Sequence, residues 1–315
     1  MCAKDKHHYV QQAYLKGFCS KSNPSELWEY DKKEKVLSNR IKSVRLICCS
    51  HHYYAVPVSE DEIDHELLEN AFNLIEDPFI RVLRTLGPKK DGEKIKVSHS
   101  ELMSLAEYIS FQLVRVPMFR DNVHGMARDS VVRAISILLD SGEIPHPSPE
   151  VAEKINGSGG LNVKIEDFFS LPSMGEIAPM IIESLLCKRW FLYVPHADFN
   201  YVVSDNPARF ISATPEISVV GPADPFASIY MPLRKDLALA ISPQSLSVNN
   251  VENQRITEHL NVCYLNKNQT KYFNRETAKY AQRFVYNSSQ NEKLSRMIFK
   301  LPYVESCAKA EKLFV

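Results

Sequence analysis

The sequence lacks an excess of charge of either sign. Lys and Arg together number 38, and Asp and Glu together also number 38, so the formal net charge is zero. Proteins that coat nucleic acid without sequence preference usually carry a strong basic excess, so this balance disfavours that class. A local basic cleft is still compatible with zero net charge. Copies of the chain would repel one another little, so a homo-oligomer is possible.

Long apolar runs and secreted disulfide patterns are also missing. No stretch approaches the roughly 18 apolar residues of a transmembrane helix, and the polar segment 1–8 holds no apolar signal core. The chain has seven cysteines, an odd number, and their spacing resembles no disulfide framework. We therefore expect a cytoplasmic protein with reduced thiols and no membrane partner.

Familiar catalytic signatures are absent as well. The sequence contains no GxGxxG, no Walker A loop, no HExxH and no GxSxG. The Cys48-Cys49-Ser50-His51-His52 cluster offers soft ligands, but neighbours on a strand point to opposite faces, so we do not expect zinc there. The sequence requires no cofactor, although it is compatible with a divalent metal.

Periodicity and turn residues predict an α+β fold. Apolar residues at helical spacing predict helices over 61–86, 98–116, 121–140, 174–188, 250–262 and 269–284. Strand-forming residues predict a hairpin over 27–36 and strands over 47–58, 189–193, 201–204, 228–231 and 237–241. A central helical segment thus lies between strand-rich N-terminal and C-terminal parts, which we expect to form a mixed or antiparallel sheet.

Two further features bear on domain organisation. The strand over 189–193 is followed by a turn over 195–200 and the next strand, a spacing that is typical of neighbouring strands. The stretch 144–160 contains three prolines and a Gly-Ser-Gly-Gly run, so it is predicted as a loop. We expect residues 1–315 to form one domain, with a possible subdomain boundary in that loop.

The first candidate site is the polar segment near the N-terminus. His7 and His8 are side chains suited to proton transfer near neutral pH, and Tyr9 and Gln12 follow them closely. Beside lysines, a His-Tyr pair could act on a phosphodiester. The alternative is a polar segment without chemistry, in which Tyr9 packs inward.

The second candidate is a Gln-Arg pair on the predicted helix over 98–116. Gln112 and Arg115 are three residues apart and therefore share one side of the helix. Together they could bind a phosphate or a carboxylate. The alternative is a structural arginine that pairs with a carboxylate such as Glu76 or Asp205.

The third candidate is the sequence Ser204-Asp205-Asn206-Pro207, which directly succeeds an apolar strand. Asp205 at the end of a strand could act as a general base or as a metal ligand. The alternative is a tight turn, because Asp and Asn before Pro favour that structure.

These motifs together resemble the domain-of-unknown-function 4238 family. The opening motif of that family, His-Tyr-Val-Pro-Gln followed by Tyr-Leu and Phe, is matched by His8, Tyr9, Val10, Gln12, Tyr14, Leu15 and Phe18. Further matches are Leu27-Trp28-Glu29-Tyr30-Asp31, Glu76, Gln112-x-x-Arg115-x-Pro117, Ser204-Asp205-Asn206-Pro207, Met231-Pro232-Leu233, Asn274, Arg283 and Val285-Tyr286. The resemblance extends over nearly the whole chain, which favours one family-length unit.

The chain departs from the family pattern at two positions. Gln11 stands where the family usually has Pro, and Arg234 stands where Ser is common. Neither change removes an obvious catalytic group. We therefore expect that the chemistry needs neither the proline nor the serine of the family pattern. The resemblance implies a bacterial protein, because similar single-gene proteins occur among anti-phage defence genes.

Three functions fit these residues. The first is a defence or toxin-like nuclease with RNA as the favoured substrate, in which His7, His8, Glu76 and Asp205 supply acid–base groups. Its substrate contacts would be Tyr9, Gln12, Gln112, Arg115, Asn206 and Arg283, with the arginines stabilising phosphate charge. The second is a sensor or binding module that recognises a phage-encoded trigger protein or a small ligand, and the third is an oligomeric scaffold.

Overall fold

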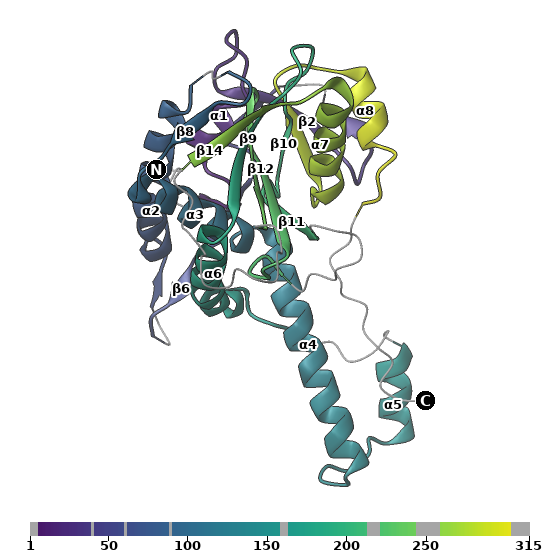
Figure 1. The fold of residues 1–315 in the computed structure, drawn as a ribbon. Coiled ribbons are helices and arrows are strands. Elements are labelled where there is room, and N and C mark those ends of the chain that lie inside the picture. The colour runs from purple at the N-terminus through teal and green to yellow at the C-terminus, as the bar shows by residue number, and fades with distance from the viewer. Residues whose placement is uncertain are drawn as a thin grey trace.

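The chain folds around two separate β-sheets with helices on their outer faces (Figure 1). The structure, a computed structural model, describes residues 6–38, 41–59, 62–87, 90–157, 163–212, 221–243 and 259–303. Both antiparallel and parallel strand pairs are present, so the predicted α+β class with a mixed sheet is confirmed. Among the described residues, no helix combines the length and the apolar character that crossing a membrane requires.

The six-stranded sheet, called the large sheet below, forms the centre of the molecule. Its order is β11 (Arg209–Ser212), β12 (Ala227–Arg234), β13 (Leu237–Ser242), β9 (Arg189–Val194), β14 (His259–Tyr264) and β8 (Lys94–Lys96). Strand β14 runs parallel to β9, and the other neighbouring strands are antiparallel. Nearly every residue of β12 and β13 is buried, as expected for strands covered on both faces.

The small sheet joins the two ends of the described chain. It consists of β10 (Val203–Ser204), β15 (Phe284–Asn287), β2 (Glu26–Asp31), β3 (Val36–Leu37) and β4 (Lys42–Ser43). Strand β2 pairs with β15 from Trp28 to Asp31, so an N-terminal and a C-terminal segment share one ladder. The predicted hairpin over 27–36 is confirmed by the pairing of β2 with β3.

Two short strand pairs and one small helix flank these sheets. Strand β1 (Lys6–His8) pairs with β5 (Cys49–His51), and β6 (Val56–Pro57) pairs with β7 (Ile63–Asp64). Helix α1 (Gln12–Lys16) comes after β1, and its buried Tyr14 hydroxyl donates to the carbonyl of Pro232 in β12. The N-terminal segment is therefore fixed against the large sheet.

The longer helices lie in the middle and at the end of the chain. They are α2 (Leu67–Thr85), α3 (His99–Val114), α4 (Pro117–Asp140), α5 (Pro149–Gly157), α6 (Ser170–Leu186), α7 (Lys267–Tyr280) and α8 (Glu292–Ile298), with a 3₁₀ turn at Asp167–Phe169. The capping box predicted from Ser98 and Glu101 is present at the start of α3. Helix α2 continues through Pro78 without interruption.

Helix α4 starts earlier than the sequence pattern predicts and leaves the body of the molecule. Pro117 occupies its first turn, where a missing N–H costs nothing, so the proline begins this helix instead of ending the previous one. In Figure 1 the C-terminal half of α4 projects away from the sheets, with α5 beside it. We call α4 residues 126–140 together with α5 the arm.

Several predicted elements are corrected by the structure. The stretch 144–160, predicted as a loop, contains helix α5. Residues 250–258 of the predicted helix over 250–262 lie outside the described residues, and its remaining part is strand β14, in which buried Leu260 and Val262 alternate with more exposed neighbours. Helix α7 ends at Tyr280, and β15 occupies part of the predicted helix over 269–284.

The predicted strand over 47–58 is broken. Cys48 and His52 have positive φ angles of 53° and 50°, a conformation that L-residues rarely adopt and that no continuous strand allows. The segment therefore forms β5, a turn and β6. The predicted strands over 189–193 and 201–204 are not neighbours either, because β9 belongs to the large sheet and β10 to the small one.

Candidate functional site

Arg115 ends helix α3 and is almost completely buried, with a side-chain exposure of 2%. Its Nε and Nη2 atoms donate to Gln112 Oε1 at 3.1 and 2.8 Å, and Nη1 donates to Glu76 Oε1 of α2 at 2.6 Å. The rings of Phe72 and Tyr108 lie 5.4 and 5.5 Å from the guanidinium carbon. Each guanidinium nitrogen thus has a protein acceptor, and the predicted structural pair of Arg115 with Glu76 is present.

The same network ties helix α3 to the N-terminal strand. The Gln112 amide donates to the carbonyl of Tyr9 at 3.0 Å, and the Tyr54 hydroxyl donates to the carbonyl of Arg115 at 3.3 Å. The backbone N–H of Tyr54 in turn donates to His7 Nδ1 at 2.8 Å. Buried polar groups need such partners, so these contacts fix β1 relative to α3.

His7 is buried inside this network. Its ring stacks on that of Tyr54, with the ring centres 5.8 Å apart and the planes 8° from parallel. Because Nδ1 accepts a hydrogen bond from a backbone amide, the neutral ring carries its proton on Nε2. The structure therefore holds His7 in one tautomer within the core.

His8 points to the opposite side of the strand and is half-buried. Burial lowers the pKa of its imidazole, with Arg115 and Lys6 acting in the same direction and backbone groups of Arg45 and Val44 opposing them. The Gln12 amide lies 3.5 Å from His8 Nδ1, and His8 Nε2 is buried without a hydrogen-bond partner among the described residues. His8 is consequently neutral at pH 7.

A carboxylate that the sequence analysis missed lies next to His8. Burial, followed by the charge of Glu76, raises the pKa of Glu69 in α2 to about 6, while Arg115 and the backbone amide of His8 act in the opposite direction. Its Oε1 atom is buried and has no hydrogen-bond partner within the described part of the chain. Two titratable groups whose pKa values are shifted by burial, downward for His8 and upward for Glu69, thus lie side by side.

Two further histidines, His52 and His65, contact each other just before α2. His65 comes four residues before Glu69, and its Nδ1 atom is also buried without a partner among residues that the structure describes. The His65 and His52 rings are 4.5 Å apart between centres. His65 lies just before α2, and its four-residue spacing from Glu69 within the predicted helix over 61–86 is the signal in the sequence that could have indicated them.

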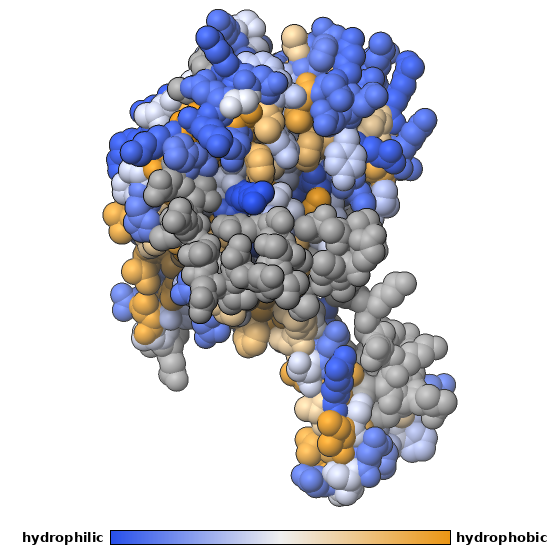
Figure 2. Space-filling view, viewed as in Figure 1, coloured by the Kyte–Doolittle hydropathy of each residue, from blue (hydrophilic) through white to orange (hydrophobic). Residues whose placement is uncertain are grey.

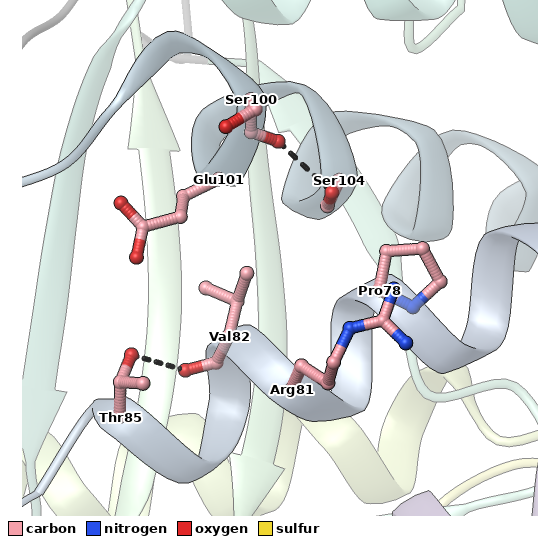
Figure 3. Close-up of a pocket in the computed structure, with 7 residues that line it drawn as sticks. All are labelled: Pro78, Arg81, Val82, Thr85, Ser100, Glu101 and Ser104. Atoms are coloured by element: carbon pink, nitrogen blue, oxygen red, sulfur yellow. Dashed lines mark hydrogen bonds between the residues drawn. The ribbon is translucent and has the colours of Figure 1, made fainter.

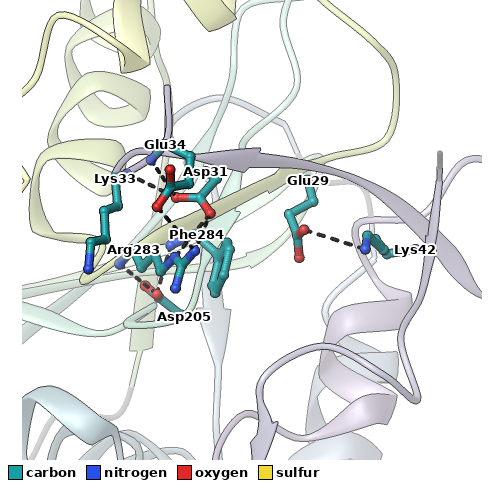
Figure 4. Close-up of polar contacts among 8 residues, drawn as sticks. All are labelled: Glu29, Asp31, Lys33, Glu34, Lys42, Asp205, Arg283 and Phe284. Carbon is teal, nitrogen blue, oxygen red and sulfur yellow. Dashed lines mark hydrogen bonds and ion pairs between the residues drawn. The ribbon is translucent and has the colours of Figure 1, made fainter. Parts of the chain in front are cut away.

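The predicted residues Asp205, Asn206 and Arg283 form a second group, drawn in part in Figure 4. The Asp205 carboxylate is buried and accepts from the backbone amides of Gln282, Arg283 and Phe284 at 2.9, 2.7 and 2.8 Å. Burial raises the pKa of Asp205 to about 6, although these amides and Lys32 favour its charged form. The carboxylate thereby holds the start of strand β15.

Asn206 and Arg283 also contact protein groups. Asn206 Nδ2 donates to the carbonyl of Tyr280 at 3.1 Å, at the end of α7. Arg283 donates through Nε and Nη2 to Asp31 Oδ2 at 3.0 and 2.7 Å and links β15 to β2. The contacts of the Ser-Asp-Asn-Pro motif therefore agree with the structural interpretation of this motif, a turn after the strand.

Tyr9 lies between the two groups of predicted residues. Its carbonyl accepts from Gln112 in the first group, and its buried hydroxyl is close enough to Cys48 and Asp205 for their charges to raise its pKa, after burial itself. The structure thus brings the N-terminal motif, Glu76 and the Gln-x-x-Arg motif together. It places Asp205, Asn206 and Arg283 next to that group on the side of Tyr9.

The cavity drawn in Figure 3 lies between α2 and α3 and has a volume of about 310 Å³. It is lined by Pro78, Arg81, Val82, Thr85, Ser100, Glu101 and Ser104, which include none of the predicted site residues. The cavity is therefore distinct from the polar network around Arg115. Across the described ranges, no group of three or more His, Cys, Asp or Glu side chains is arranged to hold a metal ion.

The fold and the two groups define an α+β protein with a buried Arg–Glu–Gln network beneath a His–Glu pair. The chain belongs to the family described as Protein of unknown function (DUF4238), whose model matches residues 6–291. This match confirms the resemblance found in the sequence motifs. No curated protein and no solved structure matches the chain at a significant level.

Proposed function

We propose that this protein is a nuclease of bacterial anti-phage defence that cleaves RNA by acid–base chemistry. The observation that carries the proposal is the pair of His8 and Glu69. Burial shifts the pKa of both groups, and the Oε1 atom of Glu69 is buried without a hydrogen-bond partner among the described residues. Titratable groups whose pKa values are shifted by burial are typical of catalytic sites.

In this proposal His8 is the general base. Its neutral ring takes the proton of the ribose 2′-hydroxyl, the 2′-oxygen attacks the phosphorus atom, and the bond to the 5′-oxygen breaks. Protonated Glu69 donates a proton to the leaving 5′-oxygen, and the products are a 2′,3′-cyclic phosphate and a 5′-hydroxyl. The rate then falls as pH rises through about 6, because Glu69 loses its proton, and it also falls at low pH, where His8 becomes protonated.

The remaining residues position this pair or contact the substrate. Gln12 lies within 3.5 Å of the His8 ring and is placed to contact a phosphate oxygen. Arg115 acts through its contacts with Glu76 and Gln112, which hold α2 and β1 together. Asp205, Asn206 and Arg283 position strand β15 through the contacts described above, and Tyr9 links the two groups.

The test is incubation of the purified protein with total cellular RNA and with DNA, in magnesium and in EDTA. We expect RNA cleavage that His8→Ala and Glu69→Gln each reduce by about 100-fold or more, the usual contribution of a general acid or base. His99→Ala serves as the matched control, because this histidine is exposed at the start of α3. Undiminished cleavage in both site variants would contradict the assignment, and loss of activity only in EDTA would indicate a metal-dependent reaction.

A second candidate function is a binding module for a phage-encoded trigger protein. The arm favours it, because apolar side chains are exposed there: Met126 at 63%, Ile137 at 66% and Val151 at 46%. Figure 2 shows hydrophobic residues at the surface of this projecting part. Exposed apolar groups gathered on a projection are typical of protein-binding surfaces. Absence of cleavage in every reaction above would favour this function.

A further inference from the structure

Arg209 is a buried arginine outside the site described above. It begins strand β11 at the edge of the large sheet, and its side chain is 2% exposed. Its Nη1 atom donates to Glu276 Oε2 of α7 at 3.2 Å. The rings of Tyr230 and Tyr280 lie 4.9 and 5.3 Å from the guanidinium carbon and form two aromatic walls.

The opposite edge of this guanidinium has no acceptor among the residues that the structure describes. Nε and Nη2 of Arg209 are both buried there without a hydrogen-bond partner. The hydroxyl of Tyr201 is also buried without a partner in the described chain, and its ring contacts that of Tyr230 edge-on at 6.4 Å. Burial accordingly lowers the pKa of Arg209, with Tyr230 and Glu276 opposing this effect.

Two other arginines show what this edge of a guanidinium binds elsewhere in the molecule. Arg283 uses its Nε and Nη2 atoms together to hold a carboxylate oxygen of Asp31, and Arg115 uses the same two atoms to hold the amide oxygen of Gln112. This edge presents two parallel N–H groups that match one oxygen or the two oxygens of a carboxylate. In Arg209 the same edge is buried and meets no acceptor from the described residues.

We propose that Arg209 is the base of a binding site for a small carboxylate. The ligand accepts hydrogen bonds from Nε and Nη2, and the rings of Tyr230 and Tyr280 enclose it. Glu276 already neutralises the guanidinium charge, so any bound anion adds uncompensated negative charge to a buried site. A singly charged carboxylate adds less of this charge than a doubly charged phosphate and is therefore favoured. The site does not depend on RNA cleavage.

The test is thermal unfolding of the full chain in increasing sodium acetate, with sodium chloride at equal ionic strength as the reference. We expect a saturable rise in Tm with acetate and a smaller or absent rise with inorganic phosphate. Arg209→Lys keeps a positive charge but has no two-pronged edge, so the acetate-dependent rise should disappear. Arg45→Lys, a change at an exposed arginine, should leave the rise intact.

A second variant keeps the test decisive if Arg209→Lys does not fold. Glu276→Gln retains an acceptor for Nη1 and removes the competing negative charge, so acetate should bind several-fold more tightly. No saturable effect of acetate on the original chain would overturn the proposal, and water would then satisfy the free edge. An acetate effect that is unchanged in both variants would also overturn it, because binding would then occur elsewhere.

Discussion

Lys32 shows how a single buried charge affects the stability of this fold. It is 1% exposed, and its Nζ atom donates to the carbonyls of Lys279 and Ala281 at 3.0 and 2.7 Å. These carbonyls lie at the C-terminal end of α7, where a cation is favourable. Burial nevertheless lowers the pKa of Lys32 to about 8, with the charge of Asp205 opposing the shift.

The lowered pKa of Lys32 predicts a rise in stability with pH. The unfolded lysine keeps its proton up to a pKa of about 10.4, whereas the folded lysine loses it near 8, so the unfolded state binds more protons between these values. The contribution of Lys32 to stability therefore increases as pH rises from about 7.5 to about 9.5 and is lost as pH falls through 8.

Urea unfolding at about pH 7.5, 8.5 and 9.5 measures this effect. The free energy of unfolding should rise less steeply with pH in Lys32→Met than in the original chain, and some slope remains because burial also lowers the pKa of Lys188 to about 8. Lys33→Met, at an exposed neighbour, is the control and should leave the slope unchanged. Equal slopes in Lys32→Met and the original chain would show that Lys32 titrates normally.

For single residues, the sequence predicts contacts between side chains better than it predicts the chemical role of those side chains. The pairing of Arg115 with Glu76 and the turn at Asp205 are both alternatives that the sequence leaves open, and the contacts show them. The sequence pattern misses Glu69, because a carboxylate on a helix is expected to be exposed unless tertiary packing buries it. The catalytic and substrate-binding roles of the predicted residues stay predictions.

Helix α1 depends on a close approach to the large sheet. A Cβ atom on Gly17 would lie 3.0 Å from the Cβ of Arg234 and 3.1 Å from the carbonyl oxygen of Tyr14. The carbonyl of Gly17 also accepts from the backbone N–H of Lys235 at 3.1 Å. Glycine is therefore the residue that lets α1 reach the turn between β12 and β13.

We expect Gly17→Ala to lower the free energy of unfolding by about 1–3 kcal/mol, the usual cost of overpacking. The matched control is Gly175→Ala in α6, where a Cβ atom meets nothing within 4 Å. That change should stabilise the protein by about 0.5–1 kcal/mol, because alanine favours a helix over glycine. Chemical denaturation measures both, and changes of the same sign would contradict the close approach of α1.

The elements that the sequence mispredicts have local causes. Strand β14 is predicted as helix because its six residues are too few to show a clear alternation. Strands adjacent in sequence are expected to be adjacent in space, so β9 is expected to pair with the strand over 201–204. Its actual partners, β13 and β14, come much later in the chain, and the order of segments does not reveal them. By contrast, α3 has a long apolar stripe and is predicted almost to its ends. The C-terminal end of α2 is predicted as well, but α2 begins at Leu67, and the first residues of the predicted helix over 61–86 include strand β7.

The arm distinguishes the two proposed functions at the level of the whole molecule. Replacing Met126 and Ile137 together by Asp removes apolar surface and should change stability by less than about 0.5 kcal/mol per site, as for most surface substitutions. If the arm binds a phage protein, cells that express this variant lose their resistance in plaque assays. Met180→Asp, at an exposed methionine of α6, is the control and should preserve resistance.

The readout of this test is independent of catalysis. Should the arm variant keep resistance while His8→Ala loses it, the arm is not the recognition surface and the nuclease proposal gains support. Loss of resistance with intact RNA cleavage in the arm variant would assign recognition to the arm and chemistry to the His8–Glu69 pair.

The ladder between β2 and β15 has a consequence for how the chain is made. Asp31 pairs with Phe284, so 253 residues must emerge from the ribosome after Asp31 before its strand finds this partner. At synthesis rates of about 5–20 residues per second this interval is roughly 10–50 s. Throughout it, the edge of β2 that later pairs with β15 stays unpaired, and an unpaired strand edge is prone to aggregation. A nascent chain of this kind needs protection from aggregation until β15 has been synthesised.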